Sequence, residues 1–210
     1  MCSAYIILIF SKLIRIRNLD TYNLVHPVFS GIMGQLYLAF SIGIFEGMKN
    51  VYFVRHAKSS WAHPELSDHD RPLNDRGHRD APEMARYLLD EGHSIDLILT
   101  STAQRALTTA AYFRDTFGLD EDHFWKESEL YHASAETLVG ILRQLTEEFV
   151  NVAVFAHNPG MSMLANSLSQ VYIDNVPTCG VTHARCKVSW DECYSDHLEF
   201  VKLYTPRNIQ

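Results

Sequence analysis

Short apolar runs alternate with amphipathic segments over most of the chain. The runs are rich in leucine, β-branched and aromatic residues, a composition typical of strands that are buried on both faces. The last two runs alternate apolar and polar positions around a polar turn, which predicts a hairpin at a sheet edge. The predicted strands are residues 51–54, 95–99, 124–130, 152–155, 181–190 and 197–204.

The segments between these strands have the spacing of amphipathic helices. The first helix should begin after Asn74, a good N-cap residue, and extend to about residue 89, where Gly92 closes it. Pro82 lies inside this helix and should kink it, because proline cannot donate a backbone hydrogen bond. The other predicted helices reach residue 117, cover residues 135–149, and reach residue 169.

Strands that alternate with helices in this way predict an α/β fold. We expect a three-layer α/β/α architecture, with a mostly parallel central sheet and the hairpin at its C-terminal edge. Right-handed crossovers bring the carboxyl ends of parallel strands to one edge of the sheet, where α/β proteins bind their ligands. Arg55 and His56, residues 101–105, and His157 each follow a predicted strand directly, so we expect them to lie close together.

Length, charge and cysteine content narrow the class of protein. A chain of 210 residues with 47% hydrophobic residues is normally one globular domain with a substantial core. The net charge of −7 argues against nucleic acid as the partner, because a phosphate backbone requires a basic surface. The four cysteines match no close-paired zinc pattern, so we expect ordinary reduced thiols, which are typical of cytoplasmic proteins. We also expect the protein to be a monomer.

The first 47 residues differ in composition from the rest of the chain. Residues 28–45 carry no charge, but their glycines, serines and glutamine make a weak membrane span, which needs about 20 mostly apolar residues. The segment could be a membrane anchor, a helical appendage, or an upstream extension that precedes a start at Met48. We favour the extension and do not expect membrane association. The predicted working domain is therefore residues 48–210.

Basic residues follow the predicted strands in a recurring order. Arg-His stands at residues 55–56, Ser-Thr-Ala-Gln-Arg-Ala-Leu-Thr-Thr at 101–109, and Ala-His-Asn-Pro-Gly at 156–160. In this order the three motifs resemble the histidine phosphatase superfamily. Arg-Pro-Leu-Asn followed by Gly, within residues 71–77, is similar to the compact SixA-type phosphohistidine phosphatases. The resemblance covers about residues 49–206.

This resemblance implies a metal-independent hydrolase that forms a covalent phosphohistidine. His56 would attack phosphorus and become phosphorylated, and water would then hydrolyse the intermediate. Arg55 and Arg105 would bind the phosphoryl oxygens and stabilise the charge of the transition state. His157 would donate a hydrogen bond to a phosphoryl oxygen from the opposite side, and Arg71 would be a further phosphate or substrate contact. No cofactor is implied.

One residue departs from the family pattern, and the general acid is not identified by any motif. The superfamily usually has glycine after Arg-His, whereas this chain has Ala57, which does not tolerate a positive φ as glycine does. For the general acid that would protonate a leaving group, Glu129 is the one carboxylate we nominate, because it lies near the end of a predicted strand. The loop cluster of His63 and Asp-His-Asp at 68–70 is expected to be solvated rather than to bind a metal.

Three functions remain compatible with these residues. The leading hypothesis is a SixA-like phosphatase that removes phosphate from a phosphohistidine of a partner protein, because the motifs are too close together for a large cap insertion. A site without a strong acid also suits a phosphoramidate, whose P–N bond breaks more readily than a phosphate ester. The alternatives are a phosphomonoesterase for a small phosphorylated substrate and a non-catalytic phosphate-binding module.

Overall fold

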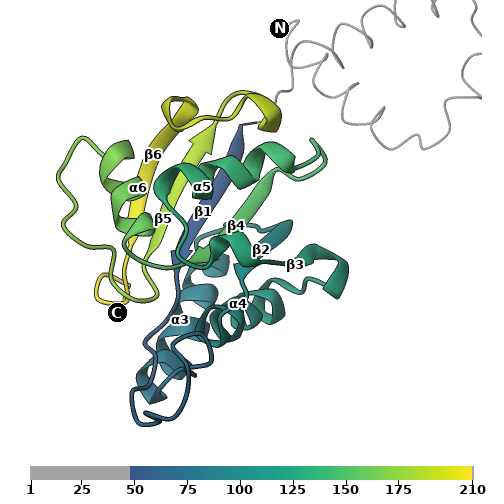
Figure 1. Ribbon diagram of the computed structural model, residues 1–210. Coiled ribbons are helices and arrows are strands. Elements are labelled where there is room, and N and C mark those ends of the chain that lie inside the picture. The colour runs from purple at the N-terminus through teal and green to yellow at the C-terminus, as the bar shows by residue number, and fades with distance from the viewer. Residues whose placement is uncertain (1–47, 210) are drawn as a thin grey trace, which may run out of the picture. The chain divides into compact units, whose positions relative to one another are not determined.

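A six-stranded sheet forms the centre of the computed structural model, which describes residues 48–209 (Figure 1). The strand order is β3-β2-β4-β1-β5-β6, so the first strand of the sheet in sequence lies inside it. Strands β3, β2, β4 and β1 are parallel, while β5 pairs antiparallel with β1 and β6 pairs antiparallel with β5. The strands are β1 (Lys49–Arg55), β2 (Leu97–Ser101), β3 (Phe124–Glu127), β4 (Asn151–Ala156), β5 (Val181–Cys186) and β6 (Leu198–Tyr204).

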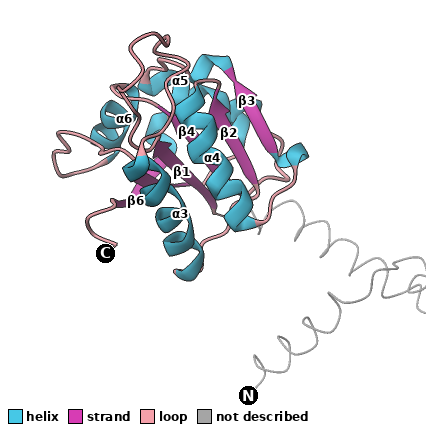
Figure 2. Cartoon of the chain, turned by 90° about the horizontal axis from the view of Figure 1, so that it is seen from below, coloured by secondary structure: helices cyan, strands magenta, loops and turns pink. Residues whose placement is uncertain are grey.

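Helices cover both faces of this sheet, as Figures 1 and 2 show. Successive side chains of a strand point to opposite faces. Accordingly, Val51 and Phe53 of β1 pack in one core cluster with residues of α5 and α6, whereas Tyr52 and Val54 pack in a second cluster with α3 and α4. The three-layer α/β/α architecture is therefore confirmed. The α-helices are α3 (Asp75–Asp90), α4 (Gln104–Phe117), α5 (Ala135–Gly140) and α6 (Gly160–Leu168).

Helix α3 begins and ends as its sequence predicts. The side chain of Asn74 accepts a hydrogen bond from the backbone N–H of Gly77 at 3.0 Å, and Gly92 after the helix has a φ of 84°. The helix continues through Pro82 as one element. A Cβ atom on Gly77 would lie 2.3 Å from the carbonyl oxygen of Lys58, so glycine lets the helix approach the turn that follows β1.

Three predicted elements are shorter in the structure than in the sequence analysis. The strand predicted over residues 124–130 ends at Glu127, and Ser128–Leu130 form a 3₁₀-helix. The helix predicted over residues 135–149 ends at Gly140 and continues as the 3₁₀-helix Ile141–Gln144, since glycine weakens an α-helix and apolar spacings of three fit both helix types. The strand predicted over residues 181–190 ends at Cys186, and 3₁₀-turns precede β6.

The interpretations of residues 1–47 concern a segment outside the described range and stay predictions. Among residues 48–209, no helix has both the length and the apolar character that a membrane crossing requires. The cysteines within that range are buried free thiols, in agreement with the sequence analysis.

Candidate active site

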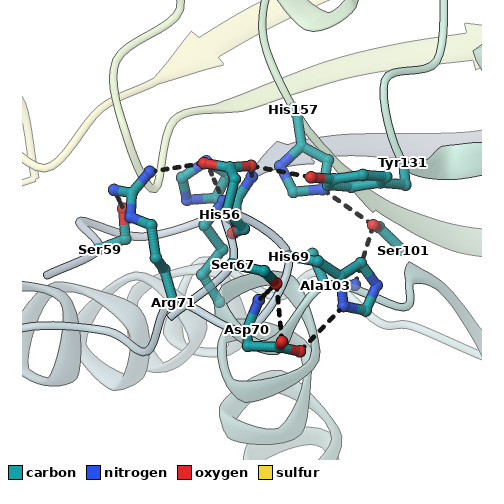
Figure 3. A network of polar contacts seen from close by, with 12 residues as sticks. His56, Ser59, Ser67, His69, Asp70, Arg71, Ser101, Ala103, Tyr131 and His157 are labelled. Atoms are coloured by element: carbon teal, nitrogen blue, oxygen red, sulfur yellow. Dashed lines mark hydrogen bonds and ion pairs between the residues drawn. The ribbon is translucent and has the colours of Figure 1, made fainter. Parts of the chain in front are cut away.

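The carboxyl ends of the parallel strands β1 and β4 bring His56 and His157 close together, and Arg71 lies near them (Figure 3). His56 directly follows β1 and is 8% exposed. Its Nδ1 lies 2.7 Å from the carbonyl oxygen of Ala57, which can only accept a hydrogen bond. Nδ1 therefore carries the proton, and Nε2 keeps its lone pair. Burial lowers the pKa of His56 to about 4, and the charges of nearby arginines act in the same direction, so the ring is neutral at pH 7.

The turn after β1 is held by a threonine that lies far away in sequence. The backbone N–H of Ala57 donates to Oγ1 of Thr109 at 2.9 Å, and this hydroxyl donates to the carbonyl oxygen of Arg105 at 2.6 Å. Ala57 is fully buried, and positive φ angles at non-glycine positions among residues 48–209 occur at His132 and Cys179. The turn therefore accommodates alanine where the superfamily usually has glycine.

Arg105 reaches His56 from the first turn of α4. Its Nε lies 3.3 Å from Nε2 of His56, which accepts the hydrogen bond. The other two nitrogens of the guanidinium bind Asp68: one donates to the carboxylate at 2.9 Å, and the other donates to the backbone carbonyl. Arg105 is thus fixed between the candidate nucleophile and an acidic side chain.

Asp68 is the carboxylate that contacts the site. Its two oxygens accept hydrogen bonds from Arg71 at 2.7 Å, from Arg105 at 2.9 Å and from the hydroxyl of Tyr131 at 2.9 Å. Burial opposes its ionisation, but hydrogen bonds from Tyr131 and Arg71 and the charge of Arg105 outweigh that effect and hold the pKa of Asp68 well below its usual range. Asp68 is exposed, as the sequence analysis expected for this loop, but its contacts with Arg71, Arg105 and Tyr131 were not predicted.

Arg71 lies beside the site but makes a set of internal contacts. It donates to the backbone oxygen of Ser60 at 3.1 Å, to the hydroxyl of Ser59 at 2.6 Å and to Asp68. Its guanidinium also stacks 3.3 Å from the ring centre of Trp61, which is 73% exposed. These contacts show that Arg71 orders the loop after His56; its contact with substrate stays a prediction.

Arg55, the last residue of β1, is held by the segment that precedes β5. One terminal nitrogen donates to the backbone oxygen of Val176 at 2.6 Å and to the side chain of Asn175 at 3.1 Å. Its Nε is buried and has no hydrogen-bond partner within residues 48–209. A buried N–H of this kind is costly unless a ligand atom accepts from it, so Arg55 can serve an oxyanion.

His157 faces His56 across the site. The two ring centres are 4.9 Å apart, and Nε2 of His157 lies 2.8 Å from the hydroxyl oxygen of Ser101. Its Nδ1 is buried and has no partner among the described residues. Burial, together with the positive charge around His56 and Arg105, keeps the pKa of His157 well below its ordinary value. A neutral His157 whose Nε2 accepts from Ser101 presents an Nδ1–H donor.

Glu129 makes none of these contacts. It is exposed in the 3₁₀-helix after β3 and makes no hydrogen bond or ion pair with another residue of the range 48–209. The structure therefore brings together five of the six predicted side chains: His56, Arg55, Arg105, His157 and, at the margin, Arg71. It adds contacts that the sequence analysis missed, made by Asp68, Thr109, Tyr131 and Ser101. The described residues contain no cluster of three or more His, Cys, Asp or Glu suited to a metal ion.

A neutral, largely buried imidazole that keeps the lone pair of Nε2 and is flanked by arginines can accept a phosphoryl group. The fold and this geometry define a phosphoryl-transfer enzyme. Comparison with known proteins agrees. Residues 51–148 match the model of the histidine phosphatase superfamily (branch 1). An uncharacterized protein of Mycobacterium tuberculosis is 30% identical over 165 residues, which cover 73% of this chain and 100% of the relative. The chain belongs to the histidine phosphatase superfamily, and it is a hydrolytic phosphatase.

Solved structures place the fold within the same superfamily. A structure named as a phosphohistidine phosphatase, SixA, from Agrobacterium tumefaciens has a TM-score of 0.63 and 29% identity, and the match covers 75% of this chain and 98% of that one. A phosphoserine phosphatase from Entamoeba histolytica, solved with 3-phosphoglyceric acid, has a TM-score of 0.53 and 13% identity, with 77% and 99% covered. The second likeness shows the fold alone.

Proposed function

We propose that this protein removes the phosphoryl group from phosphohistidine on a partner protein, through a covalent intermediate on His56. The ionised state of Asp68 carries this proposal. An alkoxide leaving group must be protonated as an ester bond breaks, and a carboxylate held ionised by Arg71 and Arg105 cannot supply the proton. A phosphoimidazole can carry the needed proton on its own distal ring nitrogen and leave as neutral imidazole, so it needs no acid from the protein. A site whose contacting carboxylate is anionic therefore favours a P–N bond over a P–O bond.

The geometry supports a two-step displacement. Nε2 of His56 attacks phosphorus in line and a P–N bond to His56 forms. The P–N bond to the substrate breaks, its electron pair goes to the substrate ring, and that ring, protonated at its distal nitrogen, leaves as neutral imidazole. Arg55 and Arg105 bind phosphoryl oxygens, and Nδ1–H of His157 donates to another. Water then attacks the phosphorus of phospho-His56, orthophosphate leaves, and the lone pair of Nε2 is restored. His157 is too weakly basic in the free protein to be charged at pH 7, so its contribution is a neutral hydrogen bond.

The surroundings of the site also suit a protein substrate. Trp61 lies beside Arg71 with one face against the guanidinium and is 73% exposed. A rigid aromatic side chain that faces solvent next to a reactive centre offers a contact for a protein surface or for the substrate imidazole. The matched SixA structure is named for phosphohistidine, which agrees with this proposal.

The competing function is hydrolysis of a small phosphate ester, and the likeness in fold to a phosphoserine phosphatase keeps it in the test. We would measure kcat/KM of the full chain on a phosphohistidine peptide, a phosphoserine peptide, para-nitrophenyl phosphate and sugar phosphates. The expected result is at least about a tenfold preference for phosphohistidine, with acid-labile phosphate on His56 after quenching in base.

Two variants decide between the functions. His56→Ala should lower kcat by about 10³-fold or more, because the covalent step is lost. Glu129→Gln should leave kcat within about twofold, since this exposed side chain contacts no other group of the site. A preference for esters together with a large loss in Glu129→Gln would overturn the proposal and support the metabolite phosphatase. Phosphate binding without any turnover that depends on His56 would support the binding module instead.

A further inference from the structure

Asp68 occupies the donor groups that a phosphoryl group needs. Every nitrogen of the Arg105 guanidinium already has a partner: one donates to the carboxylate of Asp68, one donates to the backbone carbonyl of Asp68, and Nε donates to His56. A carboxylate and a phosphoryl group both accept hydrogen bonds from a guanidinium, so a phosphoryl oxygen can replace the carboxylate at the nitrogen that it occupies. The carboxylate of Asp68 therefore acts as an anion within the phosphate site of the free protein.

The side chains of Arg105 and Asp68 differ in exposure and in the kind of element that carries them. The side chain of Arg105 is 6% exposed and is attached to the first turn of α4, whereas the side chain of Asp68 is 47% exposed and belongs to the loop that follows His56. When a dianionic phosphoryl group approaches Arg105, like charges repel, and the exposed loop carboxylate is the partner that can turn away. Arg71 and Tyr131 can keep their hydrogen bonds to Asp68 as it does so.

Resting on the proposed function above, we propose that Asp68 is a displaceable internal anion: it holds Arg105 against His56 in the free protein and is exchanged for the phosphoryl group of the substrate. The exchange has two consequences. Arg105 is positioned before substrate arrives, which favours turnover. Asp68 also competes with every phosphate, including the product orthophosphate, and so weakens product inhibition. Asp68 is thus a positioning residue that acts through Arg105.

Equilibrium binding of inorganic orthophosphate tests this proposal, because binding needs no turnover. We would measure the Kd by calorimetry at pH 7.5 for the full chain and for Asp68→Asn. The matched control is Glu65→Gln, which removes one negative charge from the same loop; among the described residues the side chain of Glu65 has its polar contact with His63. We expect Asp68→Asn to bind orthophosphate about tenfold more tightly, because an internal competitor is gone, and Glu65→Gln to change the Kd by less than about twofold.

Kinetics provide a second readout that a purely structural role would not give. In Asp68→Asn the substrate KM should fall because the competitor is absent, while kcat also falls because Arg105 is no longer held against His56. Tyr131→Phe keeps the ion pair between Arg105 and Asp68 and removes the hydrogen bond that Tyr131 donates to Asp68. This variant should therefore give a smaller gain in phosphate affinity, about threefold. This variant carries the test if Asp68→Asn does not fold.

The outcomes separate the two proposals. Unchanged or weaker orthophosphate binding in both Asp68→Asn and Tyr131→Phe would overturn the inference, as would an equal gain in Glu65→Gln. If phosphohistidine is hydrolysed and no affinity gain appears, the inference fails while the proposed function stands. If phosphate affinity rises in Asp68→Asn but no phosphorylated substrate is hydrolysed, the internal anion stands and the proposed function fails.

Discussion

The buried His56 makes the stability of the protein depend on pH between the pKa values of its folded and unfolded states. The ordinary pKa of histidine is 6.5, and burial lowers that of His56 to about 4 in the folded protein. Between these values the unfolded chain binds a proton that the folded chain does not. The free energy of unfolding is therefore fully present above pH 6.5 and falls as the pH is lowered towards 4.

The size of this loss of stability follows from the difference between the pH and the ordinary pKa of histidine. At pH 5 the contribution of His56 is about 2 kcal/mol of lost stability, because pH 5 lies about 1.5 pH units below the unfolded pKa and each unit corresponds to about 1.4 kcal/mol. This figure depends little on the folded value as long as that value lies below 5. His183, whose pKa burial also lowers to about 4, adds to the acid sensitivity of the whole protein.

Urea unfolding at pH 7 and pH 5 measures this contribution. We expect the wild type to lose about 2 kcal/mol more than His56→Asn between the two pH values. Each protein is compared with itself, so the fixed cost of the substitution cancels. His63→Asn, which replaces an exposed histidine, should behave like the wild type. Equal losses in the wild type and in His56→Asn would refute the account of a buried neutral nucleophile.

Two further predictions concern the packing that positions the site. Thr109→Val leaves the buried N–H of Ala57 without an acceptor, so urea unfolding should show a loss of about 1–3 kcal/mol together with slower turnover; an unchanged midpoint would contradict this. Gly77→Ala forces a Cβ against the backbone oxygen of Lys58 and should cost about 1–3 kcal/mol in the same assay, whereas Gly140→Ala meets only an ordinary contact and should be neutral or stabilising by up to about 1 kcal/mol. Equal midpoints for the two glycine variants would argue against a close approach at Gly77.

The parts of the site that follow strands could be predicted from the sequence. Arg55, His56 and His157 stand immediately after apolar runs, and parallel topology brings the ends of such runs to one edge. Arg105 could be placed because it lies in the first turn of the helix that follows β2. These positions depend on local pattern and on the handedness of the crossovers, which are both properties of the chain alone.

The parts that depend on side-chain contacts between loops could not be predicted. Asp68 lies in a polar loop with no periodicity, and the nearest available signal was its position three residues before Arg71, with which it pairs. Glu129 was nominated from a strand that ends three residues earlier than expected, so this carboxylate lies in an exposed 3₁₀-helix instead of at a strand end. Which of several loop carboxylates meets an arginine is decided by tertiary packing.

The place of β1 inside the sheet affects how the protein is made. Asn50 and its neighbour Asn151 on β4 are 101 residues apart in sequence, and the partner on the other side, β5, lies later still. During synthesis the apolar strand β1 therefore leaves the ribosome without its neighbours. It stays unpaired until β4 and β5 have also emerged. Pairing between strands that are distant in sequence slows folding. It also leaves an unpaired, aggregation-prone strand edge exposed to other chains. His56 is thus made before β4 and β5, and its surroundings are complete only after both strands have been synthesised.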